Sequence, residues 1–291
     1  MKFAAISEHR AQYPVVMMCR LLGVSKSGFY AWLGRPASAR QSENEALKAR
    51  IVEIHVGSRG TYGSPRIQAE LLESGCRHGR NRIARLMREL GVEGVHKRRH
   101  RTLTRRDERD PVAPNVLEQD FQAVAPNEKW VADITYVRTH EGWLYLATVM
   151  DLFSRRIVGW SMSDRLETTL VRDALVMAMR RRGRVRGVIH HSDRGCQYTS
   201  RGFRSLLRAA GIRCSMSGTG NCYDNAVAES FFATLKKECV PRNGYRDRNE
   251  ARAKLFDYIE NFYNRRRRHS ALGYVAPARY EAEYEGAVLA A

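Results

Sequence analysis

Apolar and polar positions near the start of the chain follow the spacing of short helices that bury one face. Within residues 13–33, the pattern predicts an apolar helix that ends at Gly23, since glycine readily takes the left-handed conformation that closes a helix. Ser25 follows and is suited to cap a second helix, which is rich in aromatic residues. This pair predicts a small helical unit.

Residues 61–92 carry a second pair of helices, joined by a turn at Gly75. Ser64 and Pro65 predict the start of the first helix, because serine can cap a helix and the missing N–H of proline is not needed in the first turn. The second helix is predicted to end at Gly91. The predicted apolar stripes are Ile67, Leu71 and Leu72 in the first helix and Ile83, Leu86, Met87 and Leu90 in the second.

The opposite face of the second helix carries Arg82, Arg85 and Arg88. Two helices joined by a short turn can place the second helix in the major groove of DNA, so these arginines are candidates for DNA contact. The same pattern also fits a small bundle whose arginines are only solvated. We therefore expect residues 1–95 to form a helix–turn–helix DNA-binding region, with solvated arginines as the open alternative.

Residues 96–115 lose the apolar periodicity. Six lysines and arginines precede the first acid, and two prolines follow. This composition predicts a basic linker over residues 96–125, in which Lys97, Arg98 and Arg99 are candidates for phosphate contact. Charge runs are also often only solvated, so sequence-independent DNA affinity and plain solvation both remain as interpretations.

From Trp130 onward the pattern is that of strands. Three stretches rich in β-branched and aromatic residues predict antiparallel strands, with a hairpin connection between the first two. Alternating helices and short strands follow. The predicted strands are residues 130–138, 143–151, 155–162, 187–191 and 213–216, and the predicted helices are residues 167–182, residues 200–210 and the helix that carries Glu229.

Periodicity alone supports an α/β fold with a mixed sheet. This order of elements is the one expected of a ribonuclease-H-like α/β fold of the integrase catalytic core type, which we assign to residues 126–240. Residues 241–291 are expected to form a C-terminal helix and a basic tail.

Composition adds a constraint on partners, since the 291 residues carry 50 lysines and arginines against 31 acids, a net charge of +19. A surplus of this size predicts a polyanionic partner, most often nucleic acid, although charge alone also fits an anionic membrane or ribosomal RNA. The chain has no run of 18 apolar residues, so a membrane-spanning helix is not expected. Its start lacks the apolar core of a signal peptide, which predicts a cytoplasmic protein.

Six cysteines are spread along the chain without a CxxC pair. Zinc sites and disulfide frameworks usually show closely spaced cysteines, so reduced thiols are predicted. A zinc site remains the alternative, built from Cys196, Cys214, Cys222 and Cys239.

Three acids stand where the surrounding pattern does not explain them. Asp133 interrupts an apolar strand, where an ionised carboxylate is costly unless it is paired or binds a metal. Asp193 follows the strand at residues 187–191, at the carboxyl end where open α/β sheets usually keep their ligand sites. Glu229 lies in a helix, just before two phenylalanines.

Helical spacing predicts which way Glu229 points. It places Asn225, Glu229, Phe232 and Lys236 on one stripe, and Val227, Phe231 and Leu235 on the opposite, core-facing side. Glu229 is therefore expected to point away from the core, and Lys236, two turns further along, to meet a phosphate. Asn225, on the same face, is a further candidate for DNA contact.

Each acid also has a structural interpretation: Asp133 can pair with an arginine, Asp193 can shape a turn, and Glu229 can be solvated. Two other acids compete for a place in the site. We interpret Asp151 as capping the turn between two strands and Asp224 as the N-cap of the helix.

Three converging carboxylates suit Mg²⁺, which prefers oxygen ligands and keeps water or phosphate in its shell. Two such ions, about 3.5–4 Å apart, can activate an attacking oxygen and stabilise a leaving one, so that no protein nucleophile is needed. We expect two Mg²⁺ ions, with Mn²⁺ as a substitute. His191, beside Asp193, is a candidate for supporting the site or for a purely structural role.

Four stretches together resemble the retroviral-integrase-like transposases with a DDE triad, and more narrowly the OrfB proteins of the IS-three family of bacterial insertion sequences. They are WVADITYV, YLATVMDLFSRRIVGW, HHSDRGCQYTS and CYDNAVAESFFATLKKE. Between Asp193 and Glu229 lie 35 residues (229 − 193 − 1), the interval that this family shows. GTYGSPRI with RLMRELGV resembles the family's upstream helix–turn–helix, and FYNRRRRHSALGYVAPARYE resembles its C-terminal end.

The resemblance implies that Asp133, Asp193 and Glu229 are the catalytic metal ligands and that Lys236 contacts the DNA end. It implies cleavage at the ends of the element to expose a 3′-OH, followed by attack of that hydroxyl on target DNA. It also implies a homo-oligomer on double-stranded DNA in the bacterial nucleoid, with an upstream OrfA segment as partner or fusion. Two features depart from related patterns: the chain shows no leucine-zipper heptads of the OrfA kind and no His/His/Cys/Cys zinc module of the retroviral integrase kind.

Two other functions fit parts of the pattern. A ribonuclease-H-like nuclease would cleave DNA without joining it, and it would not need the long basic helical region. A non-catalytic DNA-binding regulator would use the helices alone and leave the three acids incidental. A metal-dependent DNA transposase accounts for both parts of the chain.

Overall fold

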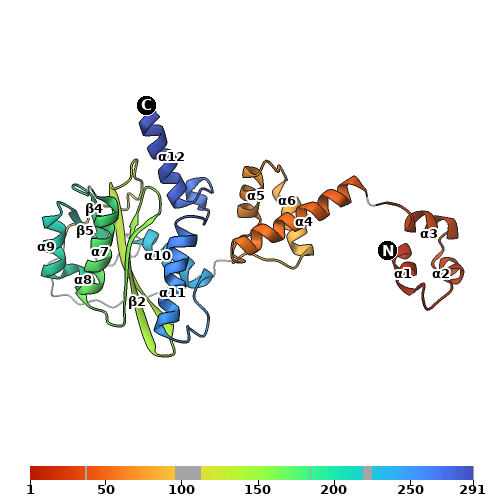
Figure 1. The fold of residues 1–291 in the computed structure, drawn as a ribbon, viewed down its shortest axis with the longest axis horizontal. Helices are drawn as coiled ribbons and strands as arrows, with labels where there is room; N and C mark the ends of the chain where they lie inside the picture. Colours follow the sequence, from red (N-terminus) through yellow and green to blue (C-terminus); the bar gives the residue numbers. More distant parts are fainter. Residues whose placement is uncertain (37, 96–112, 184, 219–224, 291) are drawn as a thin grey trace.

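The computed structural model describes residues 1–36, 38–95, 113–183, 185–218 and 225–290 (Figure 1). Its first unit contains α1 (Lys2–His9), α2 (Val15–Leu22) and α3 (Lys26–Leu33), which enclose a small core of Ile6, Met18, Cys19 and Phe29. Gly23 ends α2 in the left-handed conformation, and the Ser25 hydroxyl caps α3 by accepting a hydrogen bond from Gly28 N at 3.0 Å. The predicted end of α2 at Gly23 and the predicted cap of α3 at Ser25 are both confirmed.

A second helical unit contains α4 (Ala39–Gly57), α5 (Ser64–Glu73) and α6 (Arg80–Glu89). The sequence pattern did not predict α4. The predicted cap of α5 is wrong by one position, because Gly63 is the N-cap and Ser64 is already helical. Leu72, expected in the apolar stripe, is exposed, whereas Ile67 and Leu71 are buried as predicted.

A five-stranded mixed sheet forms the centre of the rest of the chain. Its order is β3-β2-β1-β4-β5, in which β1, β2 and β3 pair antiparallel and β4 and β5 extend the sheet in parallel from β1. The strands are β1 (Lys129–Thr139), β2 (Gly142–Asp151), β3 (Ile157–Ser163), β4 (Ile189–Ser192) and β5 (Arg213–Met216). The predicted ribonuclease-H-like α/β fold is confirmed.

Helices cover both faces of this sheet. One face packs against α7 (Thr168–Arg182), α8 (Cys196–Thr199) and α9 (Arg201–Ala209), and the other against α10 (Ala226–Glu238) and α11 (Arg248–Asp257) (Figure 1). Strand alternation explains the two layers, since Trp130 and Ala132 face α7 and α9 while Val131 and Val137 face α10 and α11. A side chain at Gly159 would begin only 2.1 Å from Ala174 O, so glycine lets α7 approach β3 closely.

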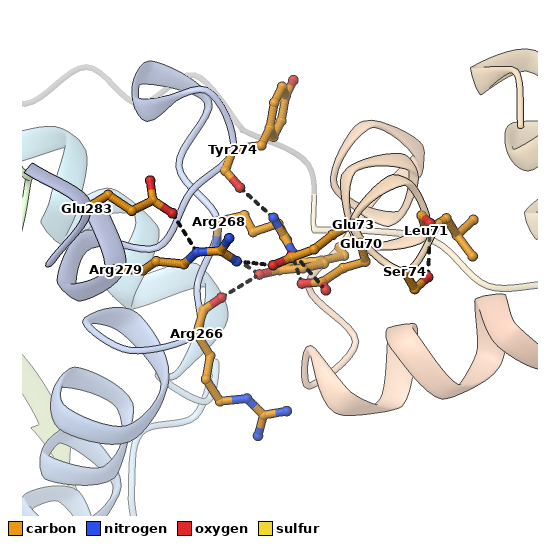
Figure 2. Close-up of polar contacts among 10 residues, drawn as sticks. Glu70, Leu71, Glu73, Ser74, Arg266, Arg268, Tyr274, Arg279 and Glu283 are labelled. Carbon is orange, nitrogen blue, oxygen red and sulfur yellow. Dashed lines mark hydrogen bonds and ion pairs between the residues drawn. The ribbon is translucent and has the colours of Figure 1, made fainter. Parts of the chain in front are cut away.

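The chain ends with a π-helical segment, η1 (Tyr258–Tyr263), a 3₁₀ turn, η2 (Ser270–Leu272), and α12 (Pro277–Ala290). This end of the chain contacts the second helical unit (Figure 2). The buried Tyr62 hydroxyl donates to Arg266 O at 3.1 Å and accepts from Arg268 N at 2.8 Å. The Arg268 guanidinium binds the Glu70 carboxylate at 2.6 and 3.0 Å and also pairs with Glu73. A long-range polar interface thus joins α5 to the C-terminal segment.

In the described part of the chain, no helix combines the length and apolar character that a bilayer crossing requires.

Candidate active site

Asp133 lies in the middle of β1, paired across the sheet with Thr148 of β2. Its side chain is half-buried, and Oδ1 accepts a hydrogen bond from the neighbouring Ile134 N at 2.7 Å. Asp133 makes no ion pair with an arginine among the described residues, so the structural interpretation of this acid as an arginine partner is not supported.

The parallel register of β1 and β4 brings Asp193 beside Asp133. Lys129, Trp130 and Val131 pair with Ile189, His190 and His191, a constant offset of 60 (189 − 129). Two residues further along, the same offset places Asp193 at the level of Asp133 (133 + 60 = 193). The β4 strand ends at Ser192, so Asp193 lies just beyond its carboxyl end, as predicted.

A turn holds the Asp193 side chain in place. Its Oδ1 accepts a hydrogen bond from Gly195 N at 3.0 Å, directly before α8 begins. This confirms part of the alternative interpretation, because Asp193 does shape a turn. Its other oxygen, Oδ2, is not used by that bond and can serve as a ligand.

The start of α10 lies over β1. Asn225 is the N-cap of α10, and its Nδ2 donates to Ala132 O at 3.4 Å, next to Asp133 in the chain. Asn225 is therefore in the N-cap position that the sequence pattern assigned to Asp224, which lies outside the described residues. Glu229 follows in the first turn of α10, and the partial positive charge of a helix N-terminus favours an acid there.

The predicted stripe of α10 is correct for two of its four residues and wrong for the other two, because Asn225, at 7% exposed, is buried and so is Phe232. Glu229 and Lys236 are exposed, while Phe231 and Leu235 are buried, as expected. Phe232, predicted to lie with Glu229, is only 6% exposed and belongs to the core. The apolar face of α10 is therefore wider than predicted, because the helix packs against both the sheet and η1.

The three acids influence one another electrostatically. Burial raises the pKa of Asp133 well above its ordinary value; the charges of Asp193 and Glu229 add to this, against the Ile134 N–H and Lys236. Burial also raises the pKa of Asp193, against its bond with Gly195, and raises that of Glu229. Repulsion between these carboxylates favours a cation in their midst.

Lys236 is a basic residue whose charge interacts with that of Asp133. Burial lowers its pKa, whereas the charge of Asp133 raises it, so the two side chains lie within electrostatic reach of each other. The Lys236 ammonium lies 4.8 Å from the centroid of the Tyr136 ring, an arrangement typical of a cation–π contact.

The donor set fits a hard divalent ion in its chemistry. All three acids offer carboxylate oxygens, and the buried Asn225 Oδ1 near them has no hydrogen-bond partner within the described residues. Among those residues, no three His, Cys, Asp or Glu side chains are close enough to surround one ion. Within the described residues, the structure thus brings Asp193 and Glu229 within electrostatic reach of Asp133 without forming a closed three-carboxylate cage.

The competing acid Asp151 is structural, as predicted. It is fully buried, its Oδ1 accepts from Phe153 N at 3.0 Å, and its Oδ2 accepts from Asn127 N at 2.8 Å. Arg182 lies 3.4 Å from the same carboxylate. His191 is also held structurally, because its ring nitrogens bind the Ser215 and Ser217 hydroxyls at 2.9 and 3.2 Å.

The predicted DNA contacts on α6 have different surroundings. Arg82 binds Asn44 and Glu43 of α4, both at 2.9 Å, and Arg85 pairs with Glu89 on its own helix. Arg88 is exposed. The candidates in the basic linker, Lys97, Arg98 and Arg99, lie outside the described residues, as does Cys222.

Sequence reasoning missed two features of the site. The Tyr198 hydroxyl is buried without a hydrogen-bond partner in the described part of the chain, and the charges of Asp133 and Asp193 add to burial in raising its pKa. Tyr136 and Trp143 form an exposed aromatic pair beside Lys236. The only sequence signal was position: Tyr198 follows Asp193 by five residues, and Tyr136 follows Asp133 by three.

Comparison with known proteins gives three family matches. Residues 42–100 match an HTH-like domain, residues 123–222 match an integrase core domain, and residues 210–277 match a second integrase core domain model. These matches cover α4–α6, the sheet, and the segments that carry the three acids.

Two relatives align over most of their length. The chain is 46% identical over 267 residues to the insertion element IS600 uncharacterized 31 kDa protein of Shigella sonnei, covering 92% of this chain and 98% of that protein. It is 44% identical over 283 residues to transposase InsF for insertion sequence IS3A of Escherichia coli strain K12, covering 97% and 98%. Among solved structures, the catalytic core domain of BIV integrase aligns at 16% identity, covering 56% and 99%, with a TM-score of 0.39. A TM-score this low does not by itself establish a shared fold.

Proposed function

Because this chain belongs to the family of insertion-sequence transposases that includes InsF of IS3, with an integrase core and an HTH-like domain, we propose that Asp133, Asp193 and Glu229 are its catalytic residues. The reaction is DNA transposition, which consists of cleavage at the ends of an insertion sequence followed by 3′-OH strand transfer into target DNA. The observation that supports the proposal is the parallel pairing of β1 with β4 up to Val131 and His191, which lie two residues before Asp133 and Asp193 respectively.

Asp133, Asp193 and Glu229 would hold the metal, with two Mg²⁺ ions as the expected occupants and Mn²⁺ as a substitute. Bound divalent ions of this kind supply Lewis-acid stabilisation of charge on a phosphodiester and lower the pKa of a bound hydroxyl. The charges of the acids also bear on DNA binding. Crowded carboxylates repel a phosphate, so the negative charge of this site must be neutralised before DNA can bind there.

Residues beside the acids supply positive charge for the DNA. Lys236, within electrostatic reach of Asp133, would contact a phosphate oxygen next to the scissile bond, whereas Asn225 is buried and its Nδ2 donates to Ala132 O, so it is not proposed as a DNA contact. In strand transfer, the element's 3′ oxygen forms a bond to a target phosphorus as the target's own 3′ oxygen leaves and takes up a proton. The protein positions both strands and contributes no covalent intermediate.

The remaining parts of the proposal concern organisation and partners. We assign DNA binding to the helical region 1–95, a basic linker to 96–125, catalysis to 126–240, and a C-terminal extension to 241–291. Double-stranded DNA from element ends and target is the substrate, bound by a homo-oligomer that works with an upstream OrfA partner or fusion. Action on chromosomal DNA would place the protein in the cytoplasm, at the nucleoid.

The test is to incubate the protein with Mg²⁺ and DNA that carries the ends of its own element. Joined products support transposition. Nicked products without joining would instead indicate a nuclease, and a mobility shift without any chemistry would indicate a DNA-binding regulator. Omission of Mg²⁺ is the control, and it is expected to remove joining while leaving binding.

A further inference from the structure

Two aromatic side chains lie exposed together on the hairpin formed by β1 and β2. Tyr136 is 53% exposed and Trp143 is 47% exposed, and their rings meet edge to face with centroids 4.9 Å apart. The pair lies diagonally across the strands, since Arg138 is the residue directly opposite Trp143. Single exposed aromatics are common on protein surfaces, whereas a contiguous exposed pair more often marks a binding surface.

Basic groups surround this pair. The Lys236 ammonium lies 4.8 Å from the Tyr136 ring centroid, and Arg138 is exposed on the same hairpin. Arg248 donates from Nε to Trp143 O at 3.3 Å. The nearby acid Glu141 accepts a hydrogen bond from Arg248 N at 3.0 Å, so part of its charge is offset. The net local charge is positive, which suits a polyanion.

The aromatic pair is also close to the catalytic acids. Alternation points Asp133 and Tyr136 to opposite faces of β1, and the Lys236 side chain links them, since it lies over the Tyr136 ring and within electrostatic reach of Asp133. Tyr136 follows Asp133 by three residues, about 10 Å at the rise of a strand. That distance corresponds to about three nucleotides of a stacked strand. The paired part of β4 covers β1 only at Lys129, Trp130 and Val131, so the stretch of β1 between Asp133 and Tyr136 is not covered by β4.

We propose that Tyr136 and Trp143 form a stacking platform for unpaired nucleobases of the DNA strand that passes the catalytic acids. The platform rests on the proposed function and extends it by naming the form of DNA that the site takes. Aromatic rings stack on bases only when those bases are not inside a duplex, and adjacent cations hold the phosphates of the same strand. A second copy of the chain is a poor occupant of this patch, because a two-fold contact would set Lys236 and Arg138 of one copy against the same positive charges of the other.

The test measures binding of the full chain without divalent metal, so that it is independent of strand transfer. Fluorescence anisotropy compares a labelled duplex bearing a five-nucleotide single-stranded extension with a fully paired duplex of equal length. Tyr136→Leu and Trp143→Leu are each expected to weaken binding of the extended duplex about tenfold and to leave binding of the paired duplex unchanged. Equal losses on both DNAs, or no loss on either, would overturn the platform.

The chain offers a matched control in Phe256, which is 48% exposed and meets Trp160 edge to face at 5.9 Å. Phe256→Leu removes an exposed ring elsewhere and is expected to leave binding of both DNAs unchanged. Tyr136→Phe keeps the ring and is expected to bind like the unaltered chain.

A second measurement does not depend on any variant folding correctly. 2-Aminopurine placed in the single-stranded extension should lose fluorescence when the unaltered protein binds, because the base stacks on an aromatic ring. Unchanged fluorescence at saturation would overturn the proposal.

Sedimentation velocity measures whether the leucine variants change self-association. If they change self-association and leave DNA binding unchanged, the pair is an interface between copies, and the platform is rejected. Failure of wild-type strand transfer would count against the proposed function alone.

Discussion

Two acids in the same sheet show how surroundings decide the role of a residue. Asp151 has two backbone N–H donors and the nearby Arg182 guanidinium. Asp133 has one backbone donor and two other acids, whose charges add to burial in raising its pKa. A half-buried carboxylate among like charges is typical of a functional site, whereas one that is fully hydrogen-bonded is typical of structure.

Glu281 of α12 is a third buried acid, and its role is structural. Its carboxylate is 2% exposed and binds the Ser154 hydroxyl, Arg156 and Arg182. Burial alone would raise its pKa, but these hydrogen bonds outweigh burial, so the pKa is lowered. We expect Glu281→Gln to reduce the free energy of unfolding by about 1.5–3 kcal/mol at pH 7, because it weakens the charged hydrogen bonds to Arg156 and Arg182, while Arg182 keeps the Asp151 carboxylate 3.4 Å away.

The effect of Glu281→Gln on the free energy of unfolding should depend on pH, and the lowered pKa of Glu281 sets the direction of that dependence. A carboxylate with a lowered pKa stabilises the fold above its unfolded pKa of about 4.3, and this stabilisation is lost as pH falls through the lowered folded value. Urea unfolding at pH 7 and pH 3 should therefore show a difference between Glu281→Gln and wild type that shrinks in acid. A difference of equal size at both pH values would contradict this assignment. The exposed Glu283→Gln is the control, with an expected change under about 1 kcal/mol.

At this scale the positions of the three acids in the fold could be predicted from sequence: Asp133 within a strand, Asp193 just beyond the carboxyl end of β4, and Glu229 on the exposed side of α10. Tyr198 could not, since an aromatic residue in a buried helix looks like ordinary core, and its unpartnered hydroxyl is visible only in three dimensions. Tyr136 and Trp143 could not either, because strand alternation does not reveal which end of a hairpin is left uncovered.

The arginines of α6 have two interpretations, DNA contact and plain solvation, and their surroundings in the structure differ. Arg82 is held by Glu43 and Asn44, whereas Arg88 is exposed. If α6 lies in a DNA groove, Arg88→Ala should weaken DNA binding and reduce the slope of log K against log salt by about 1, because one phosphate contact is lost. Arg82→Ala should instead lower stability by about 0.5–1 kcal/mol, with the salt slope unchanged.

Salt titrations of both variants on one DNA duplex provide the measurement. An unchanged affinity and slope in Arg88→Ala would indicate that this face of the helix is only solvated. If instead only Arg82→Ala reduced the slope of log K against log salt, Arg82 would contact DNA and would give up its hydrogen bonds to α4 when DNA binds.

Among the elements, strands were predicted well because β1, β2 and β3 are rich in β-branched and aromatic residues. Helix α4 was missed because only Leu47 and Ile51 of its 19 residues are buried, which leaves a weak periodic signal. Phe232 was misplaced for a different reason. Helix α10 packs on the sheet and also on η1, where Phe231 meets Tyr263 at 4.7 Å, and a helix between two neighbours buries more than one stripe.

At the scale of the whole molecule, the polar interface in Figure 2 connects the second helical unit to the C-terminal segment. Glu70 and Arg268 are 198 residues apart in the chain, and Arg268 is mostly buried. We expect a double-mutant cycle of Glu70→Ala and Arg268→Ala to give a coupling free energy of about 1–3 kcal/mol, measured by urea unfolding. The exposed pair Arg50 and Glu53, 3.8 Å apart, is the control and should couple by less than about 1 kcal/mol.

A coupling near zero for Glu70 and Arg268 would mean that the interface does not hold the two parts together. Sequence reasoning could not predict this interface. Its ion pairs join segments about 200 residues apart, and a surface glutamate on a helix shows the same local pattern whether or not an arginine reaches it. The fold class, by contrast, could be predicted from the order of strands and helices along the chain.

The central claim is that three acids separated by up to 96 residues (229 − 133) act together on DNA. Strand transfer in Mg²⁺, measured with DNA that carries the element ends, tests it most directly in Asp193→Asn and Glu229→Gln, beside the exposed-acid control Asp164→Asn. We expect both triad variants to bind DNA like the wild type and to form no joined product, while the control joins DNA normally. Joined product from either triad variant at the wild-type rate would contradict the account.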